Sequence, residues 1–349
     1  MAIGQGAIVA FPSYLALTRE TTFGTYATGT SGVDFLSCSI KTMQEAKILE
    51  EISTRRVYSD QILTSKKVEG DLELYYDPKN VASNLLVQNA FGGAAVTSAT
   101  ATGETAGGTA FTHTVVLGNF DTGAASLSAN MRKGDSASAK IFEFSGIRVN
   151  EFSLSAEIDD AVKMNFSLIA KDSSTTSNDV STSVGMINTS PLSFVNGRLS
   201  LETTFAALTT TSFWHIQNVE LTINNNLKSD SESRRIGSNV LQVLPPGPAI
   251  IEMTFSVRYD TTTAYNAMLA GTQYSAELEF LGDTLTTSII RQGIKLQMPK
   301  IFIQEASDPE VGGPDEVLVQ EIKAVVLQDS SSASGYAIRA LITNLASSI

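Results

Sequence analysis

The chain has 349 residues, of which 42% are hydrophobic and 17% charged, and 36 Asp and Glu against 24 Lys and Arg give a net charge of −12. This composition predicts a globular chain with a sizeable core, and its acidity argues against a binder of naked nucleic acid or of an anionic membrane. The lone cysteine, Cys38, excludes an internal disulfide framework, and we find no secretory signal and no apolar run long enough to span a bilayer.

Most of the periodic segments alternate apolar and polar residues, which predicts β-strands. Such alternation indicates one buried and one solvated face, as in antiparallel sandwiches and barrels. A turn at Asp159-Asp160 joins two of these segments into a hairpin. The strands expected, in chain order, lie within 68–77, 149–159, 162–170, 218–225 and 249–260.

Helical signals are few and short. In 77–93, Asp77 and Pro78 predict a cap and a first-turn proline, an apolar stripe follows, and Gly92-Gly93 predicts the end. A second short helix is expected from Asp260 to a stop at Gly271.

Three stretches have the composition of loops. We expect 94–110 to be a low-complexity mobile loop, 171–191 to connect two domains, and 304–316 to be an acidic loop with Pro and Gly. The final segment, 336–349, alternates in a way that suits a closing strand, which could join a neighbouring molecule.

The sequence contains an internal repeat. Arg55-Arg56 is matched by Arg234-Arg235 at an offset of 179, and the motif Glu-Thr-Thr-Phe at 20–23 recurs at 202–205. Tyr76-Asp77 likewise recurs as Tyr259-Asp260, so strand, polar loop, strand and short helix follow in the same order twice. The repeat predicts two copies of one β-rich unit, at 1–175 and 192–349, joined by a linker at 176–191.

No set of residues predicts catalysis or a cofactor. The two histidines, His113 and His215, are far apart in the sequence, and with one cysteine they cannot supply a tetrahedral zinc site. The segment 134–140 bears only a faint resemblance to a Ser-x-x-Lys motif and has no partner residues. The Asp- and Ser-rich stretch 172–179 lacks the spaced ligands of a calcium loop. There is no phosphate loop or dinucleotide fingerprint. We therefore expect no enzyme activity, no metal and no cofactor.

The order of these elements resembles that of the tail tube (major tail) proteins of long-tailed bacteriophages. The resemblance covers nearly the whole chain and rests on patterns of element order and residue type. The segments that carry it are 17–29, the strand, loop, strand and helix block 36–93, the hairpin 147–172, and the second block within 214–269.

The resemblance implies a fold and a role. It implies a mainly β protein of two tandem tail-tube-type sandwich or partial-barrel units, each with one short helix and a long inter-strand arm loop. Family members close their sheets into a ring around a channel, and the rings stack into the tube that conducts the genome. With two units in one chain, three subunits would build a ring of six-fold pseudo-symmetry. The fallback is a hexamer in which the second half decorates the tube.

The implied partners are other virion components. They are further copies of the chain, a tape measure protein inside the tube, and terminator and distal tail proteins at its ends. DNA would be present only in transit, without specific binding, and there would be no membrane anchor. We expect assembly in the host cytoplasm and a final location in the virion tail.

The segment 45–67 has too many apolar residues for a freely solvated loop, which favours an inter-ring contact. The alternative is that these residues belong to two ordinary strands of the subunit's own sheet. The arginines of the two Arg-Arg pairs are expected to form bidentate hydrogen bonds with carboxylates of adjacent subunits. The residues predicted at contacts between subunits are Ile48, Leu49, Ile52, Arg55, Arg56, Val57, Ile62, Leu63, Arg234, Arg235, Ile236, Val240 and Leu241.

An acidic channel wall would also suit this role, because it repels phosphate and lets DNA slide. The main alternative function is a β-sandwich virion protein that binds a receptor or a carbohydrate, which would need an exposed aromatic platform. The lone tryptophan, Trp214, lies at a strand start where packing in the core is equally compatible with the sequence. A hydrolase ranks third, because no site is visible.

Overall fold

The protein is mainly β, as predicted. The computed structural model describes residues 13–51, 56–58, 60–99, 110–120, 126–134, 140–180, 184, 191–208, 213–285, 290–309, 311, 317–330 and 335–349. Its helices are α1 (Val81–Phe91) and α2 (Thr263–Ala270), with 3-10 turns at Phe194–Asn196, Phe205–Ala207 and Ser231–Ser233. The strands are β1 (Tyr14–Arg19), β2 (Ser31–Val33), β3 (Ser37–Cys38), β4 (Lys41–Ile48), β5 (Gln61–Tyr75), β6 (Ala95–Ala99), β7 (Phe111–Val116), β8 (Leu127–Lys133), β9 (Lys140–Glu157), β10 (Lys163–Ala170), β11 (Asp172–Thr176), β12 (Gly197–Glu202), β13 (Phe213–Trp214), β14 (Ile216–Asn224), β15 (Ile250–Arg258), β16 (Gln273–Thr284), β17 (Arg291–Ala306), β18 (Val319–Val326) and β19 (Arg339–Asn344).

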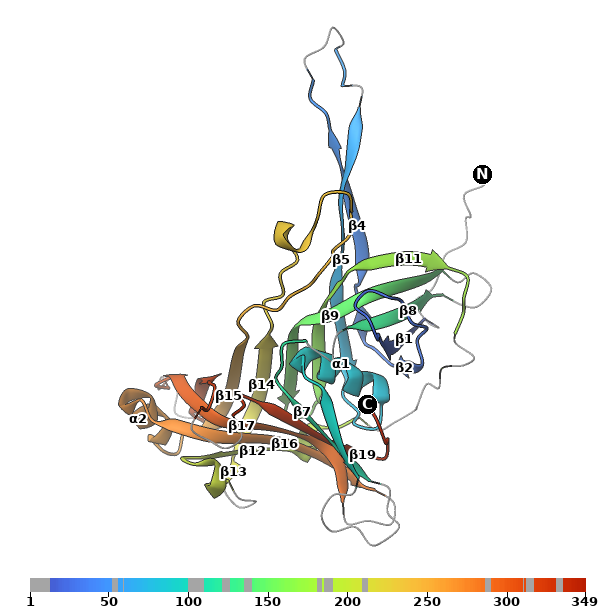
Figure 1. The fold of residues 1–349 in the computed structure, drawn as a ribbon. Coiled ribbons are helices and arrows are strands. Elements are labelled where there is room, and N and C mark those ends of the chain that lie inside the picture. The colour runs from blue at the N-terminus through green and yellow to red at the C-terminus, as the bar shows by residue number, and fades with distance from the viewer. Residues whose placement is uncertain are drawn as a thin grey trace.

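One continuous antiparallel sheet runs through the centre of the molecule (Figure 1). Its strands follow in the order β4, β5, β10, β9, β14, β15, β18, β17, and the pairing of β9 with β14 joins the two halves of the chain. The long strand β9 also pairs with β8 and β11 through its first part, so one strand links the central sheet to the layer that contains β1 and β2.

The two halves pair their strands in the same order. In the first half the order is β2, β1, β8, β9, β10, β5, and in the second it is β13, β12, β16, β17, β18, β15. A bulge falls at corresponding places: the ladder skips Asn150 in β9 and Gln304 in β17. The first hairpins also correspond, with Leu17 opposite Ser31 and Leu199 opposite Trp214. The duplication and the domain bounds themselves stay predictions.

The core lies on the face of the central sheet where the apolar residues alternate inward. Phe152 and Phe166, on neighbouring strands, have ring centroids 5.2 Å apart, and Phe91 of α1 lies 6.5 Å from Phe152. Residues 82–91 of α1 are all buried, so this helix is enclosed in the core.

The predicted helices exist, with corrections at both starts: α2 begins at Thr263, after the N-cap Thr262, rather than at Asp260. Asn80, rather than Asp77, is the N-cap of α1: its Oδ1 accepts from the Ser83 N–H at 3.1 Å, because an Asn side chain in this place satisfies a free first-turn donor. Gly92 (φ +60°) and Gly271 (φ +66°) end the two helices in the left-handed region, as their positions predicted.

Parts of the three predicted loops are strands instead, and residues 304–306 of the third are the end of β17. Residues 95–99 form β6, which pairs with β7, and residues 172–176 form β11, which pairs with β9. These Ser-, Thr- and Ala-rich segments become strands because each finds a partner strand that supplies the hydrogen bonds. Residues 100–109 lie outside the described residues. The predicted closing strand exists as β19, which pairs with β17 and β7 of its own chain.

A buried carboxylate fastens the first half together. Glu20 is 3% exposed, and its two oxygens accept four hydrogen bonds. The donors are the Gly24 N–H (2.7 Å), Ser126 Oγ (2.5 Å), Ser128 Oγ (2.7 Å) and the Gly146 N–H (2.7 Å). Glu20 therefore connects the end of β1 to β8 and to the middle of β9.

Candidate functional site

The candidate site is a long β-hairpin, here called the arm, which projects from the body of the molecule (Figure 1). It consists of β4 and the first part of β5, paired from Lys41 opposite Glu69 to Ile48 opposite Gln61. The Leu49 N–H donates to Asp60 O at 2.9 Å and carries the pairing further. Two strands without a third cannot bury their side chains, so the arm offers both faces to a partner.

Apolar side chains cover the outer part of the arm. Their exposed fractions are 54% for Ile48, 75% for Val57, 57% for Tyr58, 50% for Ile62 and 68% for Leu63. Such a cluster of exposed apolar residues on a projecting element marks an interaction surface.

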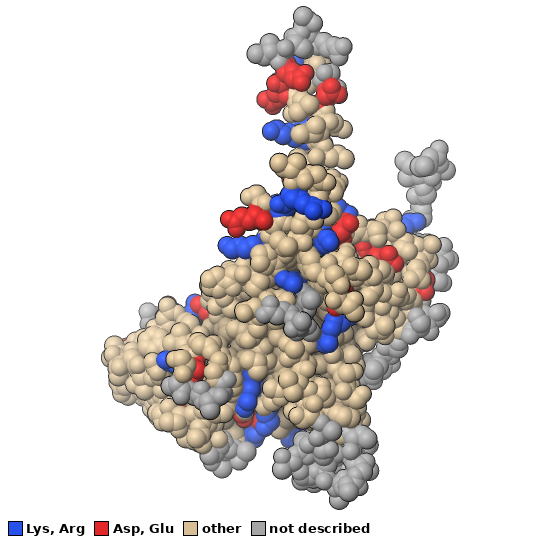
Figure 2. All heavy atoms as spheres, viewed as in Figure 1, with Lys and Arg blue, Asp and Glu red and all other residues tan. Residues whose placement is uncertain are grey.

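Charged side chains accompany these apolar groups. Figure 2 shows acidic side chains near the end of the projection and basic ones below them. The exposed acids beyond β4 are Glu50, Glu51 and Asp60, and lysines such as Lys41 and Lys67 lie closer to the body. The arm therefore has a charge pattern along its length that a partner can complement.

A bulge separates the outer arm from its base. The ladder steps from Gln44 opposite Lys66 to Ala46 opposite Leu63. Gln44 Nε2 donates to Thr64 O (3.0 Å) and Thr64 Oγ1 donates to Glu45 O (2.8 Å), so side chains replace the missing ladder bonds. Bulges strengthen the local twist of a β-ribbon, and this one sets the direction of the outer arm relative to the body.

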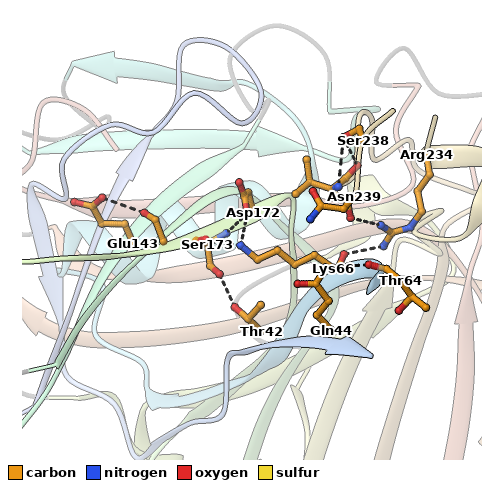
Figure 3. Close-up of polar contacts among 12 residues, drawn as sticks. Thr42, Gln44, Thr64, Lys66, Glu143, Asp172, Ser173, Arg234, Ser238 and Asn239 are labelled. Atoms are coloured by element: carbon orange, nitrogen blue, oxygen red, sulfur yellow. Dashed lines mark hydrogen bonds and ion pairs between the residues drawn. The ribbon is translucent and has the colours of Figure 1, made fainter. Parts of the chain in front are cut away.

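Lys66 is the centre of the arm's base (Figure 3). Its Nζ lies 2.5 Å from Asp172 Oδ1 and 2.5 Å from Ser173 O, both on β11. The Lys66 side chain is 18% exposed, so this ion pair is better shielded from solvent than those on the open surface. Thr42 Oγ1, 2.5 Å from Ser173 Oγ, gives β4 a second contact with β11.

The second half of the chain holds the other edge of this base. The Lys66 N–H donates to Asn239 O at 2.7 Å, and Arg234 Nη2 donates to Lys66 O at 3.1 Å. Arg234 Nη1 also donates to Asn239 O at 3.2 Å, so one guanidinium bridges the two backbones (Figure 3). The arm of the first half is thus braced by the β14–β15 loop of the second.

That loop is not a second arm, which corrects the expectation of one arm in each half. Leu241 (2% exposed) and Leu244 (1%) pack in a small core with Phe120 and Leu227 and tie the loop to the body. Pro245, Pro246 and Pro248 have no N–H to donate, so this side of the loop cannot form a ladder.

Arg148 of β9 lies beneath the loop. Its Nη1 donates to Leu244 O at 2.5 Å, and its guanidinium lies over the rings of Phe23 and Phe120 at 5.0 and 4.9 Å. Arg148 therefore links the loop of the second half to the first half, which adds to the attachment through Leu241 and Leu244.

The structure divides the predicted contact residues into two groups. Arg56 is exposed and lies on the arm together with Ile48, Leu49, Val57, Ile62 and Leu63, while Ile52 and Arg55 lie outside the described residues. The remaining five belong to the bracing loop. Of these, Ile236 is fully exposed and Arg235 is exposed, Val240 and Arg234 are half-buried, and Leu241 is buried within its own chain and has no free surface for a partner. Arg234 binds backbone carbonyls of its own chain where a carboxylate of another subunit was expected.

Sequence reasoning missed Lys66, Asp172 and Ser173. Lys66 and Asp172 lie 106 positions apart, and no local pattern links them. No local signal could have found them, because the Ser and Thr residues of 172–176 show no apolar alternation.

The solvated side of the central sheet is acidic. On β5, β9, β10, β14, β15 and β18, the residues that alternate with the core residues include eight acids and four bases. The acids are Glu69, Asp71, Glu73, Glu151, Glu157, Glu220, Glu252 and Glu321, and the bases are Lys67, Lys163, Arg258 and Lys323. We call this side the polar face. Lys163 pairs with Asp160 (2.6 Å) and Lys323 with Glu252 (3.0 Å). A hollow of about 770 Å³ between β9 and β17 is lined by Glu157, Glu220, Glu305 and Glu321 beside Lys323.

Among the described residues, no group of three or more His, Cys, Asp and Glu could hold a metal ion. His113 is buried on β7, where Nδ1 lies 2.9 Å from Thr97 Oγ1 and Nε2 lies 3.1 Å from Asn344 Oδ1, so it has a structural setting. Burial raises the pKa of the Cys38 thiol, which makes it a poorer nucleophile. No helix in the described part of the chain is both long enough and apolar enough to cross a membrane.

The protein is thus an open antiparallel sheet that carries a braced, projecting hairpin. The family model for phage tail tube proteins matches residues 13–325, which is nearly the whole chain. The chain belongs to this family and is a component of the virion tail that assembles with itself into a tube. A search of curated proteins found no match.

Replacing Arg234 by Ala should loosen the arm at its base. The change removes the hydrogen bond from the loop to Lys66 O and the one within the loop to Asn239 O, and it leaves the bond from the Lys66 N–H to Asn239 O without this support. We therefore expect amide exchange of Lys66 and its neighbours to become about tenfold faster, as the loss of about 1.4 kcal/mol of local stability would give. Hydrogen exchange with mass spectrometry measures this. Arg235→Ala is the matched control, since Arg235 is exposed. Equal exchange in both variants would contradict the bracing role.

Proposed function

We propose that three copies of this chain close into a ring of six-fold pseudo-symmetry, and that these rings stack into the tube through which DNA passes into the host. The observation that carries this proposal is the shared order of strand pairing in the two halves, with corresponding bulges at Asn150 and Gln304. The halves are already joined side by side by the β9–β14 ladder. If each chain supplies two similar wall segments, three chains supply six. The fallback is a ring of six chains.

Ring closure follows from the open sheet. An exposed strand edge is prone to pair with other strands, and closing the sheet on itself through neighbouring subunits removes such edges. A head-to-tail contact of this kind generates a closed ring when the rotation between subunits returns to its start.

The arm is proposed to hold one ring on the next. Five apolar side chains that are at least half exposed are available on it. Each contributes roughly 1.5–3 kcal/mol when fully buried, so several together outweigh the entropy cost of ordering the arm. The alternative, that the arm belongs to the subunit's own sheet, fits only its inner part, where β5 pairs with β10.

The polar face is proposed to line the channel. Its acids outnumber its bases, and Lys163 and Lys323 are each paired with a carboxylate. Such a wall offers few cations to DNA phosphate, and therefore little counterion release and weak binding. A channel lined mainly by Lys and Arg in an assembled tube would contradict this assignment.

The remaining partners follow from the tube. A tape measure protein would occupy the channel during assembly, terminator and distal tail proteins would cap its two ends, and assembly would take place in the host cytoplasm. These proposals rest on membership in the family.

The proposal is tested by examining purified protein. Negative-stain electron microscopy should show rings or tubes, and native mass spectrometry of single rings should give three chain masses. Rings of six chains would overturn the duplicated-wall proposal but keep the tube. Compact monomers under all assembly conditions would overturn the tube-forming proposal and favour a monomeric binding protein.

A further inference from the structure

The segment before β12 docks on the first half by a short backbone bridge. The Leu192 N–H donates to Tyr76 O (3.0 Å), and Leu192 O accepts from the Val162 N–H (2.8 Å). Beside it, Ala161 and Ser193 form an antiparallel bridge. Leu192 is 1% exposed, so the segment that enters the second half also covers an edge of the first.

The same place in the second half has no such segment. The Tyr259 N–H donates to Leu318 O at 2.9 Å, just as the Tyr76 N–H donates to Val162 O at 2.9 Å. In the first half, Leu192 bonds to the Val162 N–H and to Tyr76 O. Within the described ranges, no backbone hydrogen bond is made to the corresponding groups of the second half, the Leu318 N–H and Tyr259 O. Val317, the counterpart of Ala161, is 70% exposed. Among the described residues, this donor and this acceptor therefore lie on half-buried residues next to the exposed side chain of Val317.

A hollow of about 490 Å³ lies beside this place, with Arg258 and Asp260 on either side of Tyr259 in its lining. It is lined by Phe213 and Trp214 of β13, by Arg258 and Asp260 at the end of β15, and by Ala264 of α2. Trp214 packs edge-on against Phe255, with centroids 6.1 Å apart at 86°, so one wall of the hollow is rigid. Aromatic walls with a few polar groups are typical of a binding cleft.

We propose that residues 10–12 of a second copy of this chain dock at this edge and cover the hollow beside it. Ala10-Phe11-Pro12 precedes β1 as Leu192-Ser193-Phe194 precedes β12, because Leu17 of β1 and Leu199 of β12 correspond in their pairing. None of the first eighteen residues is charged, which suits an apolar docking segment. Residues 1–12 themselves lie outside the described residues. This contact between two subunits repeats the bridge that Leu192 makes within one subunit.

Another subunit supplies this segment, because β1 and the hollow lie on different sides of the molecule. Figure 1 shows β1 and β2 at one side of the molecule and α2 and β13 at the opposite side. A contact from one side of a subunit to the opposite side of the next is head-to-tail, which is the kind that closes a ring. This inference rests on the proposed ring and adds which segment fastens it.

Cysteine pairs test the contact directly. In a Cys38→Ser background, which removes the only native thiol, Phe11→Cys is combined with Val317→Cys. Cα atoms of bridged antiparallel residues lie within disulfide range. We expect oxidised rings to give covalent dimers and trimers on a non-reducing gel. Ala161→Cys with Ser193→Cys, the pair bridged within one chain, should give only a cross-linked monomer. Phe11→Cys with Leu269→Cys, which places the second thiol on an exposed residue of α2, should give no cross-link.

The outcomes separate this inference from the proposed function. Rings that form normally but yield no covalent oligomer with Phe11→Cys and Val317→Cys overturn the inference alone. A cross-linked monomer with that pair also overturns it, because the segment would then dock on its own chain. If the Cys38→Ser protein forms no rings by electron microscopy, the proposed function fails and the inference falls with it.

Discussion

Subunits in which Ile62 and Leu63 are both replaced by Asp should fold but fail to grow tubes. The two side chains are 50% and 68% exposed on the outer arm, so the subunit loses little when they change, and we expect the free energy of unfolding to stay within about 0.5 kcal/mol. A partner that buries them gains about 1.5–3 kcal/mol from each. Loss of both contacts weakens each arm attachment by about two to four orders of magnitude. Sedimentation and electron microscopy measure the tube length.

Val96→Asp is the matched control for the arm. Val96 is 65% exposed on β6, away from the arm, and carries the same change from an apolar to a charged side chain. It should leave tube length unchanged. Tubes of normal length from the Ile62 and Leu63 variant would show that the arm does not hold rings together.

Replacing Glu20 by Ala should destabilise the first half strongly. The change leaves four donors without their acceptor in a site that is 3% exposed. Unsatisfied buried donors cost about 1–3 kcal/mol each before relaxation and water entry, so we expect the free energy of unfolding to fall by about 3–5 kcal/mol. Chemical denaturation followed by circular dichroism of the backbone measures this. Tryptophan fluorescence is unsuitable, because the lone tryptophan, Trp214, reports on the second half.

Glu202 provides the control within the same chain. It occupies the position in the second half that corresponds to Glu20, since Glu-Thr-Thr-Phe occurs at both places, but it is only half-buried. Glu202→Ala should cost less than about 1 kcal/mol. Equal losses in the two variants would mean that the buried hydrogen bonds of Glu20 are not what stabilises the first half.

The alternation of apolar residues was sufficient to predict the central strands. Phe152, Leu154, Met164 and Phe166 alternate in the sequence and face one core in the structure, because successive side chains of a strand point to opposite faces. The strands β6 and β11 were missed because Ser, Thr and Ala give no apolar alternation. They gain their order from pairing with a neighbour, which a local pattern does not contain.

The candidate site was predicted only in part. The apolar composition of 45–67 was enough to identify the arm as an unusual loop. The matching Arg-Arg pairs led to the expectation of two equivalent arms, but Arg56 lies on the projecting arm and Arg234 in a folded loop at its base. The difference arises from Leu241, Leu244 and the prolines that follow, which tie the second loop to the body.

The sequence by itself determined the class of fold, the two helices, the acidity and the order of elements that indicates the tail tube family, because these depend on local periodicity, composition and order. Only the tertiary structure decided that the arm is braced through Lys66 by Asp172 and Arg234, and that one face of the central sheet gathers the acids. It also placed β7 beside β19, whose paired residues are more than 200 positions apart. Such contacts depend on the pairing of distant strands, and their partners are chosen by the packing of the whole core rather than by any neighbouring residues.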